Sequence, residues 1–164
     1  MAQVISKGVQ SDQKYVIFIM KDEEYGLEVL KIHEIVKIDT IIPVPHARPY
    51  FLGMMDIRGK VIPVIDLKGK LGLDDSADAK PDRAIIIEIE HRRVGLAVDR
   101  VSSVVQFRAE DIDQGPPAVK SVHTRYISGI GKIKERFIVL MNLEHLFSVE
   151  ELTELFSLSR VGKH

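Results

Sequence analysis

Short apolar runs separated by polar turns dominate the pattern along this chain. Residues 15–20 are all apolar and rich in β-branched and aromatic side chains, and a polar turn separates them from an extended segment at 25–29. Similar runs occupy residues 61–65 and 84–89, the first of them after a Gly-containing turn. Runs of this length between turn residues are typical of β-strands. The pattern therefore predicts an all-β protein.

The ends of the chain and one internal segment differ from this pattern. Residues 1–12 are polar without periodicity and predict a flexible tail, whereas residues 74–82 are small, polar and Pro-containing, which is typical of a linker. Ser148 and Glu151 have the spacing of a capping box, so residues 148–164 are predicted to hold a short helix and a tail. Its apolar face is expected to consist of Val149, Leu152, Leu155 and Phe156.

The two halves of the chain resemble each other. Residues 26–36 align with residues 95–105 at an offset of 69, and both read G-L-x-V-x-x-(I/V)-x-x-(I/V)-V. Residues 50–58 align with residues 126–134 at an offset of 76. A repeat of this kind indicates that one β unit of about 70 residues occurs twice.

The repeat predicts the architecture. Five short strands per unit suit a small closed barrel, because closure removes exposed strand edges. We therefore expect two similar five-stranded barrels side by side, the first over approximately residues 13–75 and the second over approximately residues 83–147. Together they form one domain over residues 13–147, and matched apolar strands line the seam between the barrels.

Charge and composition mainly exclude classes of protein. The 164 residues include 23 Lys and Arg against 24 Asp and Glu, and this balance argues against binding by a blanket of positive charge. The absence of Cys excludes disulfides, Cys-ligated metals and thiol nucleophiles. No apolar run approaches the roughly 20 residues of a membrane span, and the N-terminus lacks a signal-peptide core, so a cytoplasmic protein is expected.

Candidate chemistry is sparse. The chain contains neither G-x-S-x-G nor a phosphate-binding G-x-x-x-x-G-K-[ST] loop, and none of its six His residues pairs with another at metal-ligand spacing. We therefore predict no enzyme, no metal and no cofactor. An enzyme using His123 or His145 stays open as an alternative, although no base–nucleophile pair accompanies either residue. The single Asn, Asn142, fits either a thermophilic source or chance.

Three features favour contact with other proteins. Arg58 lies in a turn within an apolar stretch, where its planar guanidinium could pair with a carboxylate at an interface or form an internal salt bridge. Glu34 interrupts an apolar stripe. It could contact a partner protein, or it could be one of the polar residues that alternate on the outer face of a strand. The repeated G-L-x-V segments would place some Ile and Val outward from a strand, as an exposed apolar patch.

At these residues the chain resembles the CheW family, the adaptors of bacterial chemotaxis. The most specific match is G-M-M-D-I-R-G-K-V-I-P-V-I-D-L at residues 53–67, and the others lie at residues 24–27, 32–36, 94–101 and 126–129. The likeness covers approximately residues 13–147. It implies two five-stranded, SH3-like β-barrels and a non-catalytic protein that couples chemoreceptor tips to the histidine kinase CheA, bound to membrane arrays only through its partners.

The resemblance also implies two kinds of contact residue. Positions expected to face the receptor's helical hairpin lie near the seam: Ile32, Glu34, Arg58, Val101 and Val104. Positions expected to face the regulatory domain of the kinase form two segments, the first placed on the first barrel and the second on the second: Ile38, Ile41, Ile42 and Val44, then Pro116, Pro117 and Ala118. Some relatives have a bulkier apolar residue where this chain has Ala118.

Two other functions remain as alternatives. An adaptor of a related motility or surface-sensing pathway would have the same residue types. A single-stranded nucleic-acid-binding β-barrel would need a basic groove with stacking aromatics, whereas aromatic residues here are 6% of the chain, Trp is absent, and the basic residues are scattered among acids.

Overall fold

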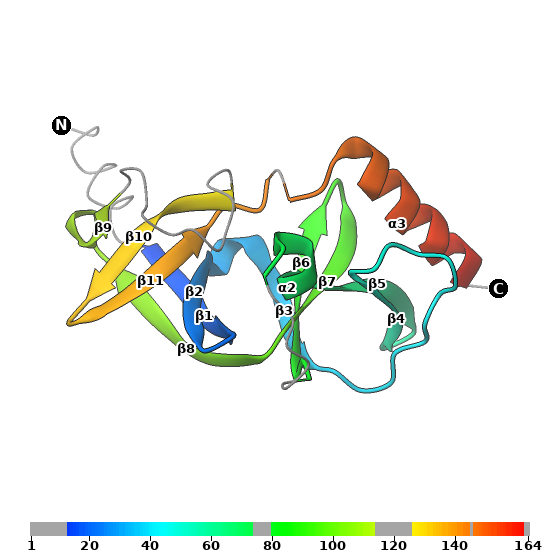
Figure 1. The fold of residues 1–164 in the computed structure, drawn as a ribbon, viewed down its shortest axis with the longest axis horizontal. Coiled ribbons are helices and arrows are strands. Elements are labelled where there is room, and N and C mark those ends of the chain that lie inside the picture. Colours follow the sequence, from blue (N-terminus) through cyan, green and yellow to red (C-terminus); the bar gives the residue numbers. More distant parts are fainter. Residues whose placement is uncertain (1–12, 74–79, 114–125, 145, 163–164) are drawn as a thin grey trace.

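Two β-sheets and a C-terminal helix form the structure, a computed structural model that describes residues 13–73, 80–113, 126–144 and 146–162, without the side chains of 158–162. Each sheet closes into a small barrel, and the two barrels lie side by side (Figure 1). The elements are β1 (Gln13–Met20), β2 (Glu23–Glu28), η1 (Val29–Lys31), β3 (Ile32–Lys37), β4 (Phe51–Ile57), β5 (Lys60–Asp66), α2 (Leu67–Leu71), β6 (Arg83–Ile89), β7 (Arg92–Val98), β8 (Arg100–Phe107), η2 (Ala109–Asp111), β9 (Ile112–Asp113), β10 (Ile127–Ile133), β11 (Arg136–Met141) and α3 (Val149–Gly162).

Barrel A consists of six strands in the order β8-β1-β2-β11-β10-β9. Barrel B consists of five strands in the order β3-β6-β7-β5-β4. Each sheet is closed by the continuation of its own edge strand. In barrel A the chain after β8 forms β9 and pairs with β10, and in barrel B the chain after β3 pairs at Ile42 with Met54 of β4. The predicted class of two SH3-like β-barrels is confirmed. Barrel A has one strand more than the five predicted, because the chain after β8 forms the two-residue β9.

The division of the chain between the barrels differs from the one predicted. The chain crosses from barrel A to barrel B between β2 and β3, and it returns between β7 and β8. Each barrel therefore takes strands from both predicted units, and the boundaries at 13–75 and 83–147 do not separate the sheets. The repeated G-L-x-V segments lie at the two crossings, so the units are alike but exchange their later strands.

The strand register shows that the repeat is structural. In barrel B the parallel pair β5–β7 sets Val64 opposite Gly95, and in barrel A the parallel pair β11–β2 sets Leu140 opposite Gly26. The offsets of 76 and 69 relate these positions to each other. Equivalent residues therefore make equivalent pairings, and each pairing joins a strand of one repeat unit to a strand of the other. This equivalence lets positions in one barrel serve as internal references for the other.

Both faces of the central strands are buried, which explains their unbroken apolar runs. On β1, Ile17 packs inside barrel A, whereas its neighbour Phe18 joins a cluster shared by both barrels. On β6, Ile86 packs inside barrel B and Ile85 joins the same shared cluster. A strand that packs on two sides has no polar alternation. The shared cluster is the seam between the barrels.

A buried ion pair joins the barrels beside this seam. Asp99 lies at the crossing between β7 and β8, and one carboxylate oxygen lies 2.8 Å from the ammonium nitrogen of Lys68 on α2. The other oxygen accepts a hydrogen bond of 3.0 Å from the backbone N–H of Lys21, in the β1–β2 turn of barrel A. Because a buried charge is costly without partners, these contacts hold the crossing in one position.

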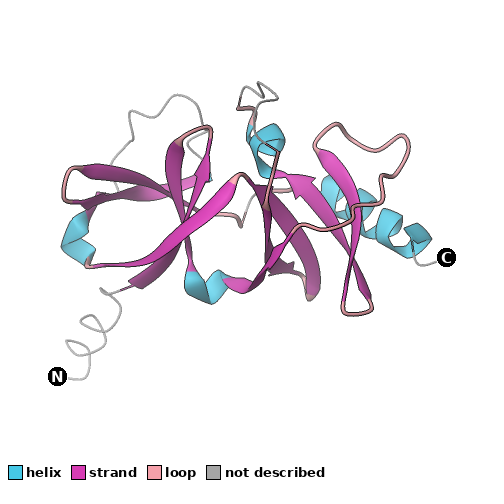
Figure 2. Ribbon diagram, turned by 90° about the horizontal axis from the view of Figure 1, so that it is seen from below, coloured by secondary structure: helices cyan, strands magenta, loops and turns pink. Residues whose placement is uncertain are grey.

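Helix α3 packs against barrel B (Figure 2). The predicted capping box is confirmed, since the Ser148 hydroxyl accepts the Glu151 backbone N–H at 3.1 Å and the Glu151 carboxylate accepts that of Ser148 at 2.9 Å. Leu152, Leu155 and Phe156 are buried as expected. The expectation for Val149 is wrong, because its side chain is 77% exposed. It begins the helix, one turn before the buried stripe reaches the barrel.

Gly53 occupies the position where barrel B closes. Its φ is 143°, and a Cβ built there would lie 2.3 Å from the carbonyl oxygen of Ile42, the residue whose backbone closes the sheet. Gly59, in the β4–β5 turn, also has a positive φ of 86°, but a Cβ there would meet nothing within 4 Å. The two glycines therefore separate the cost of backbone conformation from the cost of a backbone clash.

We expect Gly53→Ala to destabilise the protein by about 3 kcal/mol or more, since it combines φ strain with a clash that rigid backbone cannot relieve. Gly59→Ala should cost only about 1–2 kcal/mol, from φ alone. Urea denaturation of both variants measures the difference. Equal costs would show that the closure at Ile42 does not depend on the missing side chain.

Candidate interaction site

Arg58 lies at the tip of the β4–β5 hairpin. Arg58 and Gly59 are the two central residues of the turn, with φ values of 51° and 86°. Two positive φ values are typical of a type I′ turn, whose twist matches that of the paired strands. The Asp56 carboxylate accepts the Gly59 backbone N–H at 2.8 Å and supports the turn. The predicted turn is confirmed as a β-hairpin, and its geometry projects the Arg58 side chain into solvent.

Glu34 and Arg58 form an ion pair across barrel B. A guanidinium nitrogen of Arg58 donates to a carboxylate oxygen of Glu34 at 2.5 Å, which joins the hairpin tip to the edge strand β3. The hydrogen bond from Arg58 holds the pKa of Glu34 below its ordinary value. The Arg58 side chain is still 68% exposed, so much of the guanidinium remains open to a partner.

Further charges surround this pair. His33 places one ring nitrogen 3.8 Å from Glu34 and the other 3.9 Å from Glu88 of β6. Arg93 of β7 lies 3.9 Å from the same Glu88 carboxylate. The exterior of barrel B thus carries alternating charges over β3, β6 and β7. Such a surface suits recognition of a polar partner, because mismatched charges are rejected.

The apolar residues predicted to face a receptor fall into two groups. Ile32 on β3 and Val101 on β8 are half-buried, and both pack against the shared cluster at the seam. They occupy equivalent positions of the repeat, one at the start of each strand that leaves a crossing. Val104 lies farther along β8, opposite Val16 of β1, and its side chain is 59% exposed. The structure thus brings Glu34 to Arg58 and seats Ile32 and Val101 on one cluster, which Val104 does not join.

An exposed residue at the first crossing escaped the sequence analysis. Leu30 lies in η1, between β2 and β3, and its side chain is 93% exposed. Its equivalent at an offset of 69 is Asp99, the buried anion of the second crossing. The sequence contained a signal for this difference, because the repeat aligns an apolar residue, Leu30, with a charged one, Asp99. The crossings are therefore equivalent in path but not in chemistry.

The first predicted kinase segment belongs to barrel B together with β3 and β4. Its residues Ile38, Ile41 and Val44 are half-buried against the core, whereas Ile42 is 62% exposed. The backbone of Ile42 exchanges two hydrogen bonds of 2.8 Å with Met54, so its side chain is held outward. The second segment, with Pro116, Pro117 and Ala118, lies outside the described residues. Its flanking strands β9 and β10 belong to barrel A.

Comparison of the barrels shows that the fold does not require an apolar residue at position 42. The residue paired with Met54 in barrel B is Ile42, and the residue paired with the equivalent Ile130 in barrel A is Asp113. The same backbone bridge therefore accommodates an exposed carboxylate. An exposed Ile at this position is better explained by a partner than by folding.

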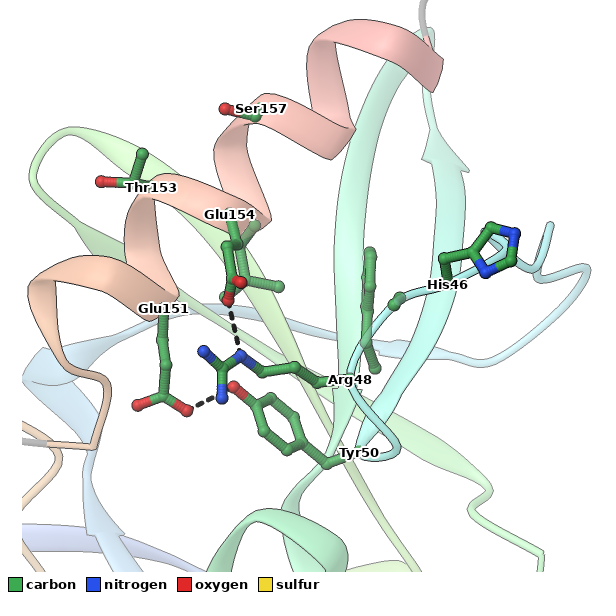
Figure 3. A pocket seen from close by; sticks show the side chains of 10 residues that line it. His46, Arg48, Tyr50, Glu151, Thr153, Glu154 and Ser157 are labelled. Atoms are coloured by element: carbon green, nitrogen blue, oxygen red, sulfur yellow. Dashed lines mark hydrogen bonds and ion pairs between the residues drawn. The ribbon is translucent and has the colours of Figure 1, made fainter.

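A pocket of about 290 Å³ lies between α3 and the connection from β3 to β4 (Figure 3). Arg48 donates to Glu154 at 2.5 Å, the Tyr50 hydroxyl donates to Glu151, and the Lys70 ammonium lies 3.2 Å from Glu151. These groups reach from the barrel to the helix and pair with each other. We interpret the pocket as the joint that holds α3, with its charges already satisfied.

The charges of this joint shift two pKa values. Burial alone would raise the pKa of Glu151, but the Ser148 backbone N–H, the Tyr50 hydroxyl and the Lys70 ammonium outweigh it and lower the pKa to about 2. Burial and the Glu151 carboxylate raise the pKa of Tyr50. Glu151 therefore remains charged in the folded protein far into the acid range.

In the part of the chain that the structure describes, no three His, Cys, Asp or Glu side chains gather as a metal site would need. Among these same residues, no helix has the length and apolar character to cross a membrane.

Comparisons with known proteins show similarity over most of the chain. The model of the CheW-like domain family matches residues 14–151. The chain is 32% identical over 140 residues to a chemotaxis protein CheW of Klebsiella aerogenes, covering 85% of this chain and 84% of that one. It is 32% identical over 133 residues to that of Helicobacter pylori, covering 81% and 80%. The crystal structure of a scaffolding protein CheW from Thermoanaerobacter tengcongensis is similar, with a TM-score of 0.75, 36% identity, and coverage of 85% and 90%.

The α3 joint predicts how stability depends on pH. Because folding lowers the pKa of Glu151 from 4.5 to about 2, its contribution is complete above about pH 5 and is lost as the pH falls toward 2. Glu151→Gln should cost about 2 kcal/mol at pH 7 and flatten this acid limb.

Urea denaturation from pH 7 to pH 3 measures both effects. Glu150→Gln is the matched control, because Glu150 is exposed in the same first turn of α3. If Glu150→Gln flattens the acid limb as much as Glu151→Gln, the effect belongs to the helix terminus and not to the joint.

Proposed function

The chain belongs to the CheW-like domain family, and on this premise we propose that it is a non-catalytic chemotaxis adaptor that couples chemoreceptor tips to the histidine kinase CheA. The observation that carries the proposal is the Glu34–Arg58 pair on barrel B. Glu34 lies near the start of β3, two residues after Ile32 at the seam, and Arg58 reaches it from the β4–β5 turn. An exposed charge pair beside half-buried apolar residues has the composition of a protein-binding site.

The receptor contact is proposed to form at the seam. A helical hairpin presents an apolar ridge flanked by polar residues, and such a ridge binds a groove with apolar walls and a charged rim. Ile32 and Val101 supply apolar walls from β3 and β8. The exposed guanidinium of Arg58 has donors left for a carboxylate or carbonyl on the helix, and the bond to Glu34 holds it in place.

The kinase contact is proposed to use a different surface, centred on Ile42. This side chain is exposed and its backbone is fixed by the bridge to Met54, so binding costs little ordering. Two partners on separate surfaces of one small protein are held close together. The adaptor then raises the effective concentration of the kinase near the receptor without any chemical step.

Substitutions at the charge pair, and at Val104 on the exposed face of β8, should weaken binding to the receptor but not to the kinase. We expect Arg58→Ala to cost about 2 kcal/mol, about a thirtyfold loss of affinity for a receptor tip fragment, if the contact is central. Arg58→Glu and Val104→Asp should cost at least as much, while binding to the CheA regulatory domain is retained. Titration calorimetry with each purified partner measures this. Unchanged receptor affinity in both Arg58→Glu and Val104→Asp, with the fold intact, would contradict the seam model.

The reciprocal variant is Ile42→Asp. It should lower affinity for the CheA regulatory domain by about tenfold or more, because it places a charge where an apolar contact is proposed. Its folding should be nearly unchanged, since Asp113 occupies the equivalent position of barrel A. Receptor binding should be retained, which makes each variant the control for the other. Full kinase affinity in folded Ile42→Asp would remove this surface from the proposal.

A further inference from the structure

The two barrels differ where their parallel strands separate. In barrel B, β5 and β7 pair only from Val64 to Asp66 against Gly95 to Ala97. Before this pairing the strands diverge, and a pocket of about 500 Å³ opens between them, bounded on one side by Phe156 of α3. In barrel A, the parallel pairing of β11 and β2 is shorter still, with only Val139 and Leu140 against Tyr25 and Gly26. The separation is therefore a property of the fold, and what fills it is a property of the side chains.

Barrel A closes the separation with an ion pair. Arg136, at the start of β11, donates to both carboxylate oxygens of Glu24 on β2, through its Nε at 3.0 Å and through a second nitrogen. Leu140 and Gly26 are paired in the parallel register of barrel A. Arg136 lies four residues before Leu140, and Glu24 lies two residues before Gly26. The bond to Glu24 raises the pKa of Arg136. A cation on one strand thus faces an anion on the other.

Barrel B has like charges at the same two positions. Four residues before Val64 is Lys60, and two residues before Gly95 is Arg93, and both line the pocket. The offsets of 76 and 69 give the same equivalences, Lys60 with Arg136 and Arg93 with Glu24. Because barrel B has Arg93 where barrel A has Glu24, it lacks the anion that pairs with the cation in barrel A. Two cations therefore border the space that a carboxylate group closes in barrel A.

The rest of the pocket adds positive charge. The guanidinium carbon of Arg92 lies 4.8 Å from the centre of the Phe156 ring, which supports it as a cation–π contact. His91 also lines the pocket. Among the described residues that line it, the only carboxylate is that of Glu88, which lies 3.9 Å from Arg93 and whose side chain is 49% exposed. Lys60, Arg92 and Arg93 against Glu88 leave an excess of two positive charges. A phosphate group carries about −1.5 to −2 at neutral pH and matches this excess, whereas one carboxylate does not.

We propose that this pocket is a binding site for a phosphate-bearing small molecule, with the phosphate oxygens between Lys60 and Arg93 and with Arg92 as the third cation. Arginine and lysine together offer the forked and point donors that phosphate accepts. The volume of about 500 Å³ lies within the range of small-molecule sites. The site adjoins the charged surface around Glu34, because Glu88 and Arg93 belong to both, whereas neither Arg58 nor Ile42 lines it.

The test uses the full chain labelled with ¹⁵N. Sodium pyrophosphate, ATP and citrate are titrated separately at constant ionic strength, and amide shifts are followed. We expect saturable shifts with pyrophosphate at residues 59–62 and 91–93, with a Kd below about 1 mM. Tighter binding of ATP would show that the organic part contributes. Citrate, which carries only carboxylates, should bind at least about tenfold more weakly.

Variants locate the ligand. Arg93→Glu reproduces the arrangement of barrel A and should weaken pyrophosphate binding by about tenfold or more. Lys60→Gln, at an exposed residue, should weaken it by about threefold or more even if Arg93→Glu does not fold. Lys14→Glu on β1 of barrel A makes a matched charge change and should leave binding within about twofold. No saturable shift, equal loss in Lys14→Glu, or citrate binding as tight as pyrophosphate would overturn the proposal.

Discussion

The exchange of strands between the two barrels is the constraint on which the rest of the structure depends. Neither sheet can close without segments from both halves of the chain, because β1 pairs with β8 and β3 pairs with β6. The central strands consequently carry two apolar faces, one for their own barrel and one for the seam. Asp99 adds a buried electrostatic link at a crossing, with partners from α2 and from the β1–β2 turn. A seam built in this way resists separation, because opening it would expose the shared core.

The same exchange makes the protein its own reference. Positions that are equivalent in backbone and register experience similar folding requirements, so a change of chemistry between them points to something other than folding. Ile42 against Asp113 is such a case, and so is Lys60 with Arg93 against Arg136 with Glu24. In the first case barrel A has an exposed carboxylate where barrel B exposes an apolar side chain. In the second case barrel A has an ion pair where barrel B has two cations. Barrel B is therefore the more specialised of the two, and it also carries the Glu34–Arg58 pair and α3.

Helix α3 connects the end of the chain to this specialised barrel. After β11 the chain leaves barrel A, and the capped helix packs Leu152, Leu155 and Phe156 against barrel B. Its acidic residues bind Arg48, Tyr50 and Lys70 from the barrel. The chain thus joins its two barrels a third time, and Phe156 becomes part of the wall of the basic pocket. The position of the helix is set by apolar burial, with the polar network fixing its orientation.

The sequence by itself determined what depends on neighbouring residues. The β-branched runs indicated the strands, Arg58-Gly59 indicated a turn, Ser148 with Glu151 indicated a capped helix, and the repeat indicated two like barrels. The motif at residues 53–67, together with the other matching segments, carried the family resemblance. All of these arise from local conformation or from spacing along the chain.

Only the tertiary structure decided which copy of the repeated unit pairs with which. Two similar units contain strands that are nearly interchangeable in pattern, so periodicity cannot distinguish pairing within a unit from pairing between units. The crossings, the bond between Glu34 and Arg58, and the meeting of Asp99 with Lys68 all follow from that choice. The exposure of Val149 depends on where the helix reaches the barrel. These features depend on contacts between residues far apart in the chain, and their free energy exists only when the whole core forms.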